Sequence, residues 1–163
     1  MKDEEKLVVV EKVGYFVGFR FLELTTLYVN FTIRIWIVAD ASVFLAVILN
    51  EGDRDWVIHE TTGQAIVAPE VLPYEIANAL IAMKRRGRLQ NKEVLRAFDL
   101  SQRIKVKLVS VNIHEAIKMA MLFNIYAYDA YYLQCCIENK SMLISLDHRM
   151  CDIAGNLGLM VVR

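Results

Sequence analysis

The chain has 163 residues, which is room for a single domain with a sizeable core. Hydrophobic residues make up 56% of it, yet the longest apolar stretch, residues 35–49, is interrupted by Asp40 and is too short to span a membrane. Lys and Arg balance Asp and Glu at 19 each, which excludes nucleic-acid binding through global charge, so any such binding needs a local basic patch.

Residues 1–34 form an N-terminal extension with two open interpretations. Three runs rich in β-branched and aromatic residues, at 7–10, 15–21 and 27–33, are typical of strands. The extension is therefore either a β-ribbon that belongs to the protein or a non-native stretch translated from a start codon set too early. Its first residues mix both signs of charge and lack the cationic start of a secretory signal. We expect the main domain over residues 35–163.

The main domain opens on an uncharged apolar run, residues 35–39, that ends at Asp40. Such a run predicts a parallel strand buried on both faces, and residues 42–50 predict a short buried helix that Ser42 could cap. A carboxylate in apolar surroundings is costly unless something pairs with it. Open α/β sheets bind their ligands at the carboxyl ends of the strands. We therefore expect Asp40 to be the first ligand of a metal site.

Helices and short apolar strands then alternate to the end of the chain. Helices are predicted over residues 53–62, from Pro73 through the cluster at 84–88, over 91–102 with Asn91 as a cap, from a capping box at Asn112 and Glu115, and over 127–138 and 150–157. Strands are predicted over residues 65–68, 106–109, 142–146 and 159–162. The alternation predicts an α/β/α sandwich around a central, mostly parallel sheet.

Four acidic residues occupy corresponding places in this pattern. Asp147 ends a strand as Asp40 does, whereas Glu75 and Asp129 lie near the starts of two helices. Strand carboxyl ends and helix starts share one side of a parallel α/β fold, so we expect the four to converge. Convergent carboxylates raise one another's pKa values unless a hard divalent cation neutralises them, and oxygen-only ligands suit Mg²⁺ or Mn²⁺. Any one of the four alone fits a helix cap or a surface position equally well.

The three cysteines indicate a cytoplasmic protein. An odd count with the adjacent pair Cys135 and Cys136 is a poor disulfide framework, and Cys151 completes no metal-ligand spacing. We interpret all three as small residues of the core in a reducing compartment.

Four segments together resemble a PIN domain of the bacterial and archaeal VapC toxin type, over residues 37–162. They are Val38-Ala39-Asp40-Ala41-Ser42-Val43, Pro73-Tyr74-Glu75-Ile76-Ala77-Asn78-Ala79-Leu80, Tyr128-Asp129-Ala130-Tyr131-Tyr132-Leu133 and Leu143-Ile144-Ser145-Leu146-Asp147. The family's four acidic positions fall on Asp40, Glu75, Asp129 and Asp147. The chain departs from the family at Ser145, where Thr is frequent, and in its 34-residue extension.

The resemblance implies an Mg²⁺- or Mn²⁺-dependent endoribonuclease that hydrolyses RNA with a metal-activated water, forms a homodimer and is held inactive by a cognate antitoxin. Asp40 and Asp129 are the expected core metal ligands, and Glu75 and Asp147 complete the metal's ligands directly or through water. Ser42 and Ser145 are expected to orient a ligand or a phosphate, with helix capping as the alternative for Ser42.

A basic cluster and four tyrosines stand beside these acids. Lys84, Arg85, Arg86 and Arg88 could neutralise RNA phosphates, but a solvated helix end or a contact with an acidic partner fits them equally well. Tyr126, Tyr128, Tyr131 and Tyr132 could stack on bases, although packing in the core or at a dimer face is the simpler interpretation. His148, beside Asp147, could contact a phosphate, although a position in a surface loop is the simpler interpretation.

Two other functions remain open. A PIN fold that has lost its activity would serve as a scaffold or RNA-binding module, and the presence of all four acids disfavours it. A phosphotransferase with Asp40 as nucleophile would commonly carry a second Asp two residues later, where this chain has Ser42.

Overall fold

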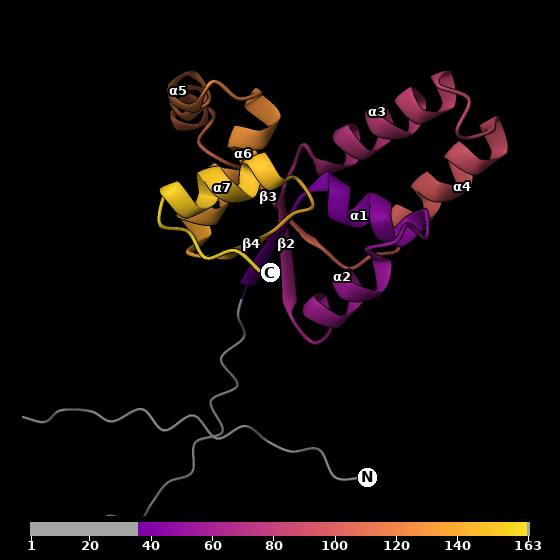
Figure 1. Ribbon diagram of the computed structural model, residues 1–163, viewed down its shortest axis with the longest axis horizontal. Helices are drawn as coiled ribbons and strands as arrows, with labels where there is room; N and C mark the ends of the chain where they lie inside the picture. Colours follow the sequence, from indigo (N-terminus) through magenta and orange to yellow (C-terminus); the bar gives the residue numbers. More distant parts are fainter. Residues whose placement is uncertain (1–35, 163) are drawn as a thin grey trace, which may run out of the picture. The chain divides into compact units, whose positions relative to one another are not determined.

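The computed structural model describes residues 36–162. The strands predicted within residues 1–34 lie outside this range. The described part is an α/β/α sandwich around a four-stranded parallel sheet, which confirms the predicted fold class. Figure 1 shows α5, α6 and α7 gathered on one side of the sheet and α3 and α4 on the other.

The sheet has the strand order β3-β2-β1-β4, with all neighbours parallel. Its strands are β1 (Trp36–Ala39), β2 (Ala65–Pro69), β3 (Lys107–Val109) and β4 (Met142–Ile144). The first run of the main domain thus lies in the middle of the sheet, as its uncharged sequence predicts, and Val38 is fully buried. The strand predicted over 159–162 is reduced to a single bridge, in which Leu143 bonds to Met160 O and Val162 N.

The seven helices of the described part match the predicted ones within a few residues. They are α1 (Ala41–Ile48), α2 (Arg54–Thr61), α3 (Leu72–Arg85), α4 (Asn91–Ser101), α5 (Ile113–Phe123), α6 (Ala127–Asn139) and α7 (His148–Asn156). None of them is long and apolar enough to cross a membrane.

The structure differs from the prediction mainly at the starts of the helices. Asp40, and not Ser42, caps α1, because its carboxylate accepts a hydrogen bond from the Val43 N–H. Asp147 caps α7 in the same way, so this helix begins at His148, two residues earlier than predicted. At α4 the cap is Gln90 and not Asn91. At α5, Asn112 caps as predicted but Glu115 does not return the bond, because the Asn112 N–H donates to Glu138.

Helix α6 carries much of the core. Its buried residues include Ala130, Leu133 and the pair Cys135 and Cys136. Burial raises the pKa of the Cys135 thiol to about 12, so this thiol stays protonated and unreactive at neutral pH. The core role predicted for the cysteine pair is confirmed, and Cys151 is half-buried.

Candidate active site

Four carboxylates meet at the carboxyl edge of the sheet. β1 and β4 are neighbours with Ala39 level with Ile144, so Asp40, directly after β1, and Asp147, three residues after the end of β4, both follow the carboxyl ends of the strands. Glu75 and Asp129 lie in the first turns of α3 and α6.

Electrostatic repulsion links the four carboxylates in a closed ring. Asp147 contributes to a raised pKa at both Asp40 and Asp129, and Asp40 and Asp129 both contribute to a raised pKa at Glu75. Burial is the larger cause at each of the three raised groups. The structure thus brings together the four acids that the sequence singled out.

Asp40 is the most buried of these acids, with 6% of its surface exposed. Its Oδ1 accepts hydrogen bonds from the Ser42 hydroxyl at 2.6 Å and the Val43 N–H at 3.2 Å, and its Oδ2 accepts one from the Ser145 hydroxyl at 2.8 Å. Burial raises the pKa of this carboxyl to about 6, against the opposing effect of the three hydrogen bonds. The side chain is fixed in position and is costly to ionise without a cation.

Ser42 and Ser145 each connect Asp40 to the segment 145–147 that follows β4. The Ser42 Oγ that donates to Asp40 accepts a hydrogen bond from the Leu146 N–H at 3.0 Å. The Ser145 Oγ accepts one from the Asp147 N–H at 2.9 Å. The two hydroxyls therefore set where Asp147 stands relative to Asp40.

Tyr132 holds Glu75, a contact that the sequence did not predict. Its hydroxyl donates a hydrogen bond of 2.7 Å to Glu75 Oε2, and the ring is 1% exposed. The backbone of Ala41 also bonds this hydroxyl, whose pKa is raised far above its usual value by burial and by Glu75. A sequence signal existed, because Tyr132 follows Asp129 by three residues and so shares its face of α6.

Arg149 is the cation that acts on the acid cluster. Burial and Asp147 raise the pKa of Asp129, whereas the backbone of Tyr126 and the charge of Arg149 lower it. The Arg149 guanidinium donates to Asn124 O at 2.7 Å, which holds it over the turn between α5 and α6. The sequence around Arg149 did not predict a place in the site, because that place depends on how α7 packs against the turn.

The acid cluster suits a hard divalent cation in donor type and in charge. Its donors are carboxylate and hydroxyl oxygens, and burial together with neighbouring carboxylates raises the pKa values of Asp40, Glu75 and Asp129. Between Trp36 and Val162, however, no three His, Cys, Asp or Glu side chains stand close enough to form a complete ligand set. Mg²⁺ usually keeps several waters and takes one or two protein carboxylates, so the residues fit such an ion without a closed cage.

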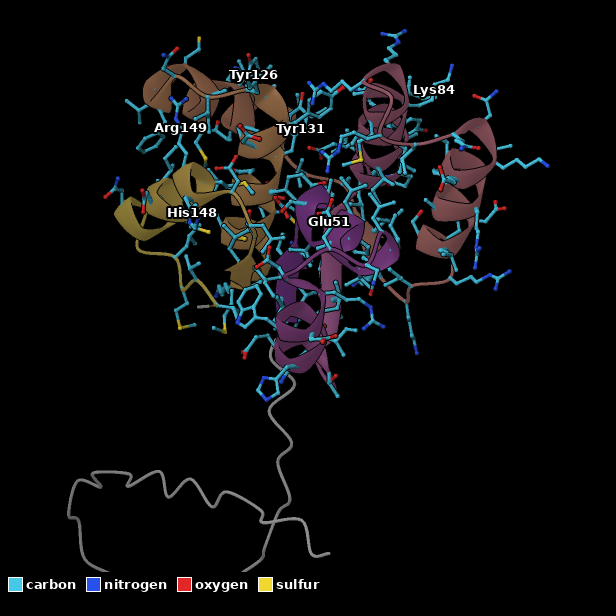
Figure 2. The ribbon with its side chains drawn as sticks, turned by 45° about the vertical axis from the view of Figure 1, so that its right-hand side comes forward. Glu51, Lys84, Tyr126, Tyr131, His148 and Arg149 are labelled. Atoms are coloured by element: carbon cyan, nitrogen blue, oxygen red, sulfur yellow. The ribbon has the colours of Figure 1, made fainter. Side chains whose placement is uncertain are left out.

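The predicted basic cluster divides in two. Lys84 and Arg85 end α3, and Figure 2 shows Lys84 on the side of the molecule opposite Arg149. The Arg88 guanidinium lies 4.0 Å from the Glu51 carboxylate. Arg88 and Ser42 both line a groove of about 640 Å³. Of the four cations, Arg88 alone lines this groove, whose wall also includes Ser42, the residue that donates a hydrogen bond to Asp40.

The tyrosines also differ from one another. Tyr132 packs in the core as expected, but Tyr126 is 82% exposed, which contradicts a core position. The rings of Tyr128 and Tyr131 meet edge to face with centroids 6.0 Å apart.

His148 is exposed, but it is the first residue of α7 and does not lie in a loop.

Comparisons with known proteins agree with the fold described above. Residues 37–156 match the family model of the PIN domain. VapC ribonuclease Mb0985 of Mycobacterium bovis and ribonuclease VapC9 of Mycobacterium tuberculosis are each 31% identical to the chain over 117 residues, which cover 71% of this chain and 89% of theirs.

Two solved structures show the same fold. PAE2754 from Pyrobaculum aerophilum matches with a TM-score of 0.59 and 20% identity, over 80% of this chain and 91% of its own. VapC20 of Mycobacterium tuberculosis, described as a sarcin-ricin loop cleaving toxin, matches with a TM-score of 0.56 and 11% identity, over 72% of this chain and 94% of its own.

Proposed function

The chain belongs to the PIN-domain family, in its VapC branch, and from this premise we propose that it is a metal-dependent endoribonuclease, the toxin of a toxin-antitoxin pair. The observation that carries the proposal is the ring of four mutually repelling carboxylates at the carboxyl edge of the sheet. RNA cleavage that needs Mg²⁺ or Mn²⁺ and is lost in Asp40→Asn is the test.

The resident metal is proposed as Mg²⁺ or Mn²⁺, which would activate water and stabilise charge on the scissile phosphate. Asp40 and Asp129 would hold it, with Glu75 and Asp147 bonding directly or through water. Asp40 suits this role because three hydrogen bonds fix its carboxylate while burial makes its ionised form depend on a nearby cation.

The other polar residues of the site position these acids. The Ser42 and Ser145 hydroxyls keep Asp40 and the 145–147 segment together, and Tyr132 keeps Glu75 turned toward the cluster. Arg149 partly offsets the negative charge near Asp129 and is the cation best placed to meet an RNA phosphate at that end of the cluster.

Arg88 is proposed as a phosphate contact on the other side of the site. It lines the groove that Ser42 reaches, and its side chain is more than half exposed. Lys84, Arg85 and Arg86 are also exposed but lie away from that groove, and a solvated helix end accounts for them.

The partners proposed for the protein are RNA, a cognate antitoxin and a second copy of the chain. Helix α5 offers the best-suited described face for a homodimer, because Ile113, Ile117 and Met121 form one exposed stripe at helical spacing. Sedimentation of Ile117→Glu beside the unchanged protein tests this, since a buried charge at the stripe should leave a monomer.

An inactive PIN scaffold is the alternative. It would bind RNA without cleaving it, and its acids would be free to change. The buried hydrogen bonds that Ser42, Ser145 and Tyr132 devote to Asp40 and Glu75 favour the active enzyme.

A further inference from the structure

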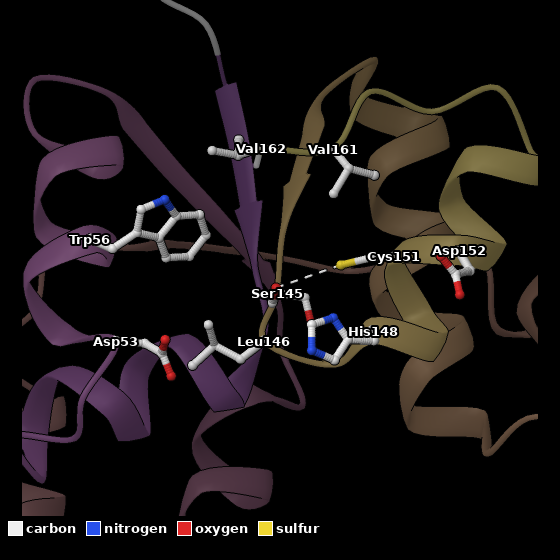
Figure 3. Close-up of a pocket in the computed structure, with 9 residues that line it drawn as sticks. All are labelled: Asp53, Trp56, Ser145, Leu146, His148, Cys151, Asp152, Val161 and Val162. Atoms are coloured by element: carbon white, nitrogen blue, oxygen red, sulfur yellow. Dashed lines mark hydrogen bonds between the residues drawn. The ribbon is translucent and has the colours of Figure 1, made fainter.

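A cavity of about 540 Å³ lies between α2 and α7, beside the end of β4 (Figure 3). This volume is within the range of pockets that hold small ligands. None of the four acids lines this cavity, so the proposed metal site lies outside it.

The cavity nevertheless adjoins the acid cluster. Ser145 forms part of its wall, and the hydroxyl of Ser145 bonds Asp40 at 2.8 Å and the Asp147 N–H at 2.9 Å. Leu146 is shared between this cavity and the groove lined by Ser42 and Arg88. A strand of RNA that reaches the acids therefore has this cavity as a neighbour.

The lining combines aromatic rings with hydrogen-bond acceptors. Figure 3 shows Trp56 of α2 and His148 of α7 on opposite sides of the cavity, and such rings stack on nucleobases irrespective of sequence. Carboxylates line the cavity at Asp53, the residue before α2, and at Asp152 of α7, and a carboxylate accepts hydrogen bonds but repels phosphate. The matching ligand is a flat group that carries N–H donors on its edge and no negative charge.

We propose that this cavity binds one base of the RNA substrate and favours bases with an exocyclic amino group, namely adenine, cytosine and guanine, over uracil. Trp56 supplies the stacking surface, and Asp53, which lies on the same side of the cavity, accepts from the amino group. This inference rests on the proposed ribonuclease function and adds a base preference next to the cleaved bond.

Trp56 itself can report on binding. The chain has two tryptophans, so Trp36→Phe leaves Trp56 as the only indole. This variant is titrated in EDTA, where RNA stays intact, with tetranucleotides of adenylate, cytidylate or uridylate. We expect saturable quenching of Trp56 fluorescence, with at least threefold tighter binding of adenylate and cytidylate than of uridylate. In Asp53→Asn/Asp152→Asn the preference should fall below twofold, because an amide can also donate to the uracil carbonyl.

Cleavage gives the second readout, with a matched control on the same helix. Trp56→Leu should lower kcat/KM on the preferred RNA about tenfold and remove the base preference, since stacking is lost. The control is Ile58→Ala. Ile58 also belongs to α2 but lines a different and largely apolar cavity, so this variant should keep the base preference. Thermal melting of both variants checks that they fold.

The outcomes separate this inference from the proposed function. Metal-dependent cleavage with an unchanged base preference in Trp56→Leu would overturn the base site and leave the ribonuclease standing. Quenching by RNA without cleavage in any metal would support the base site and contradict the ribonuclease. Quenching by arginine amide that exceeds quenching by every tetranucleotide would overturn the base site in favour of a guanidinium group from a protein partner.

Discussion

The hydroxyl of Tyr132 in α6 donates a 2.7 Å hydrogen bond to Oε2 of Glu75 in α3, across 57 positions of sequence. Asp129 lies three residues before Tyr132, so one buried helix both supplies an acid and orients another. Hydrogen bonds to a charged group contribute about 1.5–3 kcal/mol, enough to decide which way a carboxylate points.

Removing that hydroxyl should weaken the site without unfolding the protein. In Tyr132→Phe we expect kcat for RNA cleavage to fall about tenfold or more, because Glu75 loses its partner. Mn²⁺ binding measured by calorimetry should weaken as well. Tyr74→Phe, which removes the same atom from an exposed ring beside Glu75, is the control. Equal activity in the two variants would show that the bond has no role in positioning.

Two serines that flank β4 provide a matched pair. Ser145 bonds Asp40 and Asp147, whereas Ser141 is buried and its hydroxyl has no hydrogen-bond partner within residues 36–162. Ser145→Ala should therefore reduce kcat by about tenfold to a hundredfold, the effect of losing one or two bonds to charged or backbone groups. Ser141→Ala should leave activity unchanged and keep or slightly raise the melting temperature. The reverse order of effects would refute the connecting role of Ser145.

Asp40 should make the metal-free protein less stable as the pH rises. Its folded pKa, about 6, lies above its ordinary value of 3.8, so its favourable contribution is complete below pH 4 and is lost as the pH rises through 6. The pKa values of Glu75 and Asp129 are raised too and act in the same direction. Between pH 4 and 8 the Asp40 contribution falls by roughly 2 kcal/mol.

Urea unfolding in EDTA measures this effect. We expect Asp40→Asn to lose less stability than the unchanged protein between pH 4 and 8 and to be the more stable of the two at pH 8. Added Mn²⁺ should stabilise the unchanged protein at pH 8 far more than the variant, since a bound ion favours the folded state. A larger loss of stability with rising pH in the variant would contradict the assignment of this titration to Asp40.

Arg88 and Arg86 should behave differently although they carry the same charge. Arg88 lines the groove that Ser42 reaches, so Arg88→Gln should raise KM for RNA about threefold to tenfold and lower the slope of log affinity against log salt by about one. Arg86→Gln should change neither quantity by as much. Binding titrations at several salt concentrations give both values. If the slope of log affinity against log salt is the same in Arg88→Gln and Arg86→Gln, Arg88 makes no phosphate contact of its own and the two residues act only through the overall charge of the protein.

The four acids were predictable because their places follow from chain periodicity. Asp40 and Asp147 follow apolar strands, Glu75 and Asp129 lie in the first turns of helices, and a parallel sheet brings such positions to one edge. The contacts that tune the acids were not predictable in the same way. The Ser42 bond to Leu146 and the Arg149 effect on Asp129 join segments whose approach depends on the packed structure.

The residue that caps α1 was also not predictable from residue type alone. Ser is a favoured cap residue, yet at α1 Asp40 takes that position and Ser42 turns back to bond Asp40 from within the first turn. Competition between two capping residues two positions apart is decided by the backbone, since Asp40 has the extended geometry that a cap needs.

Cleavage of RNA by the purified protein tests the central claim most directly. Activity would be measured with Mg²⁺, with Mn²⁺ and with EDTA, for the unchanged chain and for Asp40→Asn, with Ser141→Ala as a variant that should keep full activity. We expect cleavage in either metal, none in EDTA, and a loss of at least a hundredfold in Asp40→Asn, because the site then lacks the carboxylate that three hydrogen bonds hold in place. Cleavage that survives both chelation and Asp40→Asn would contradict a metal-dependent acid centre.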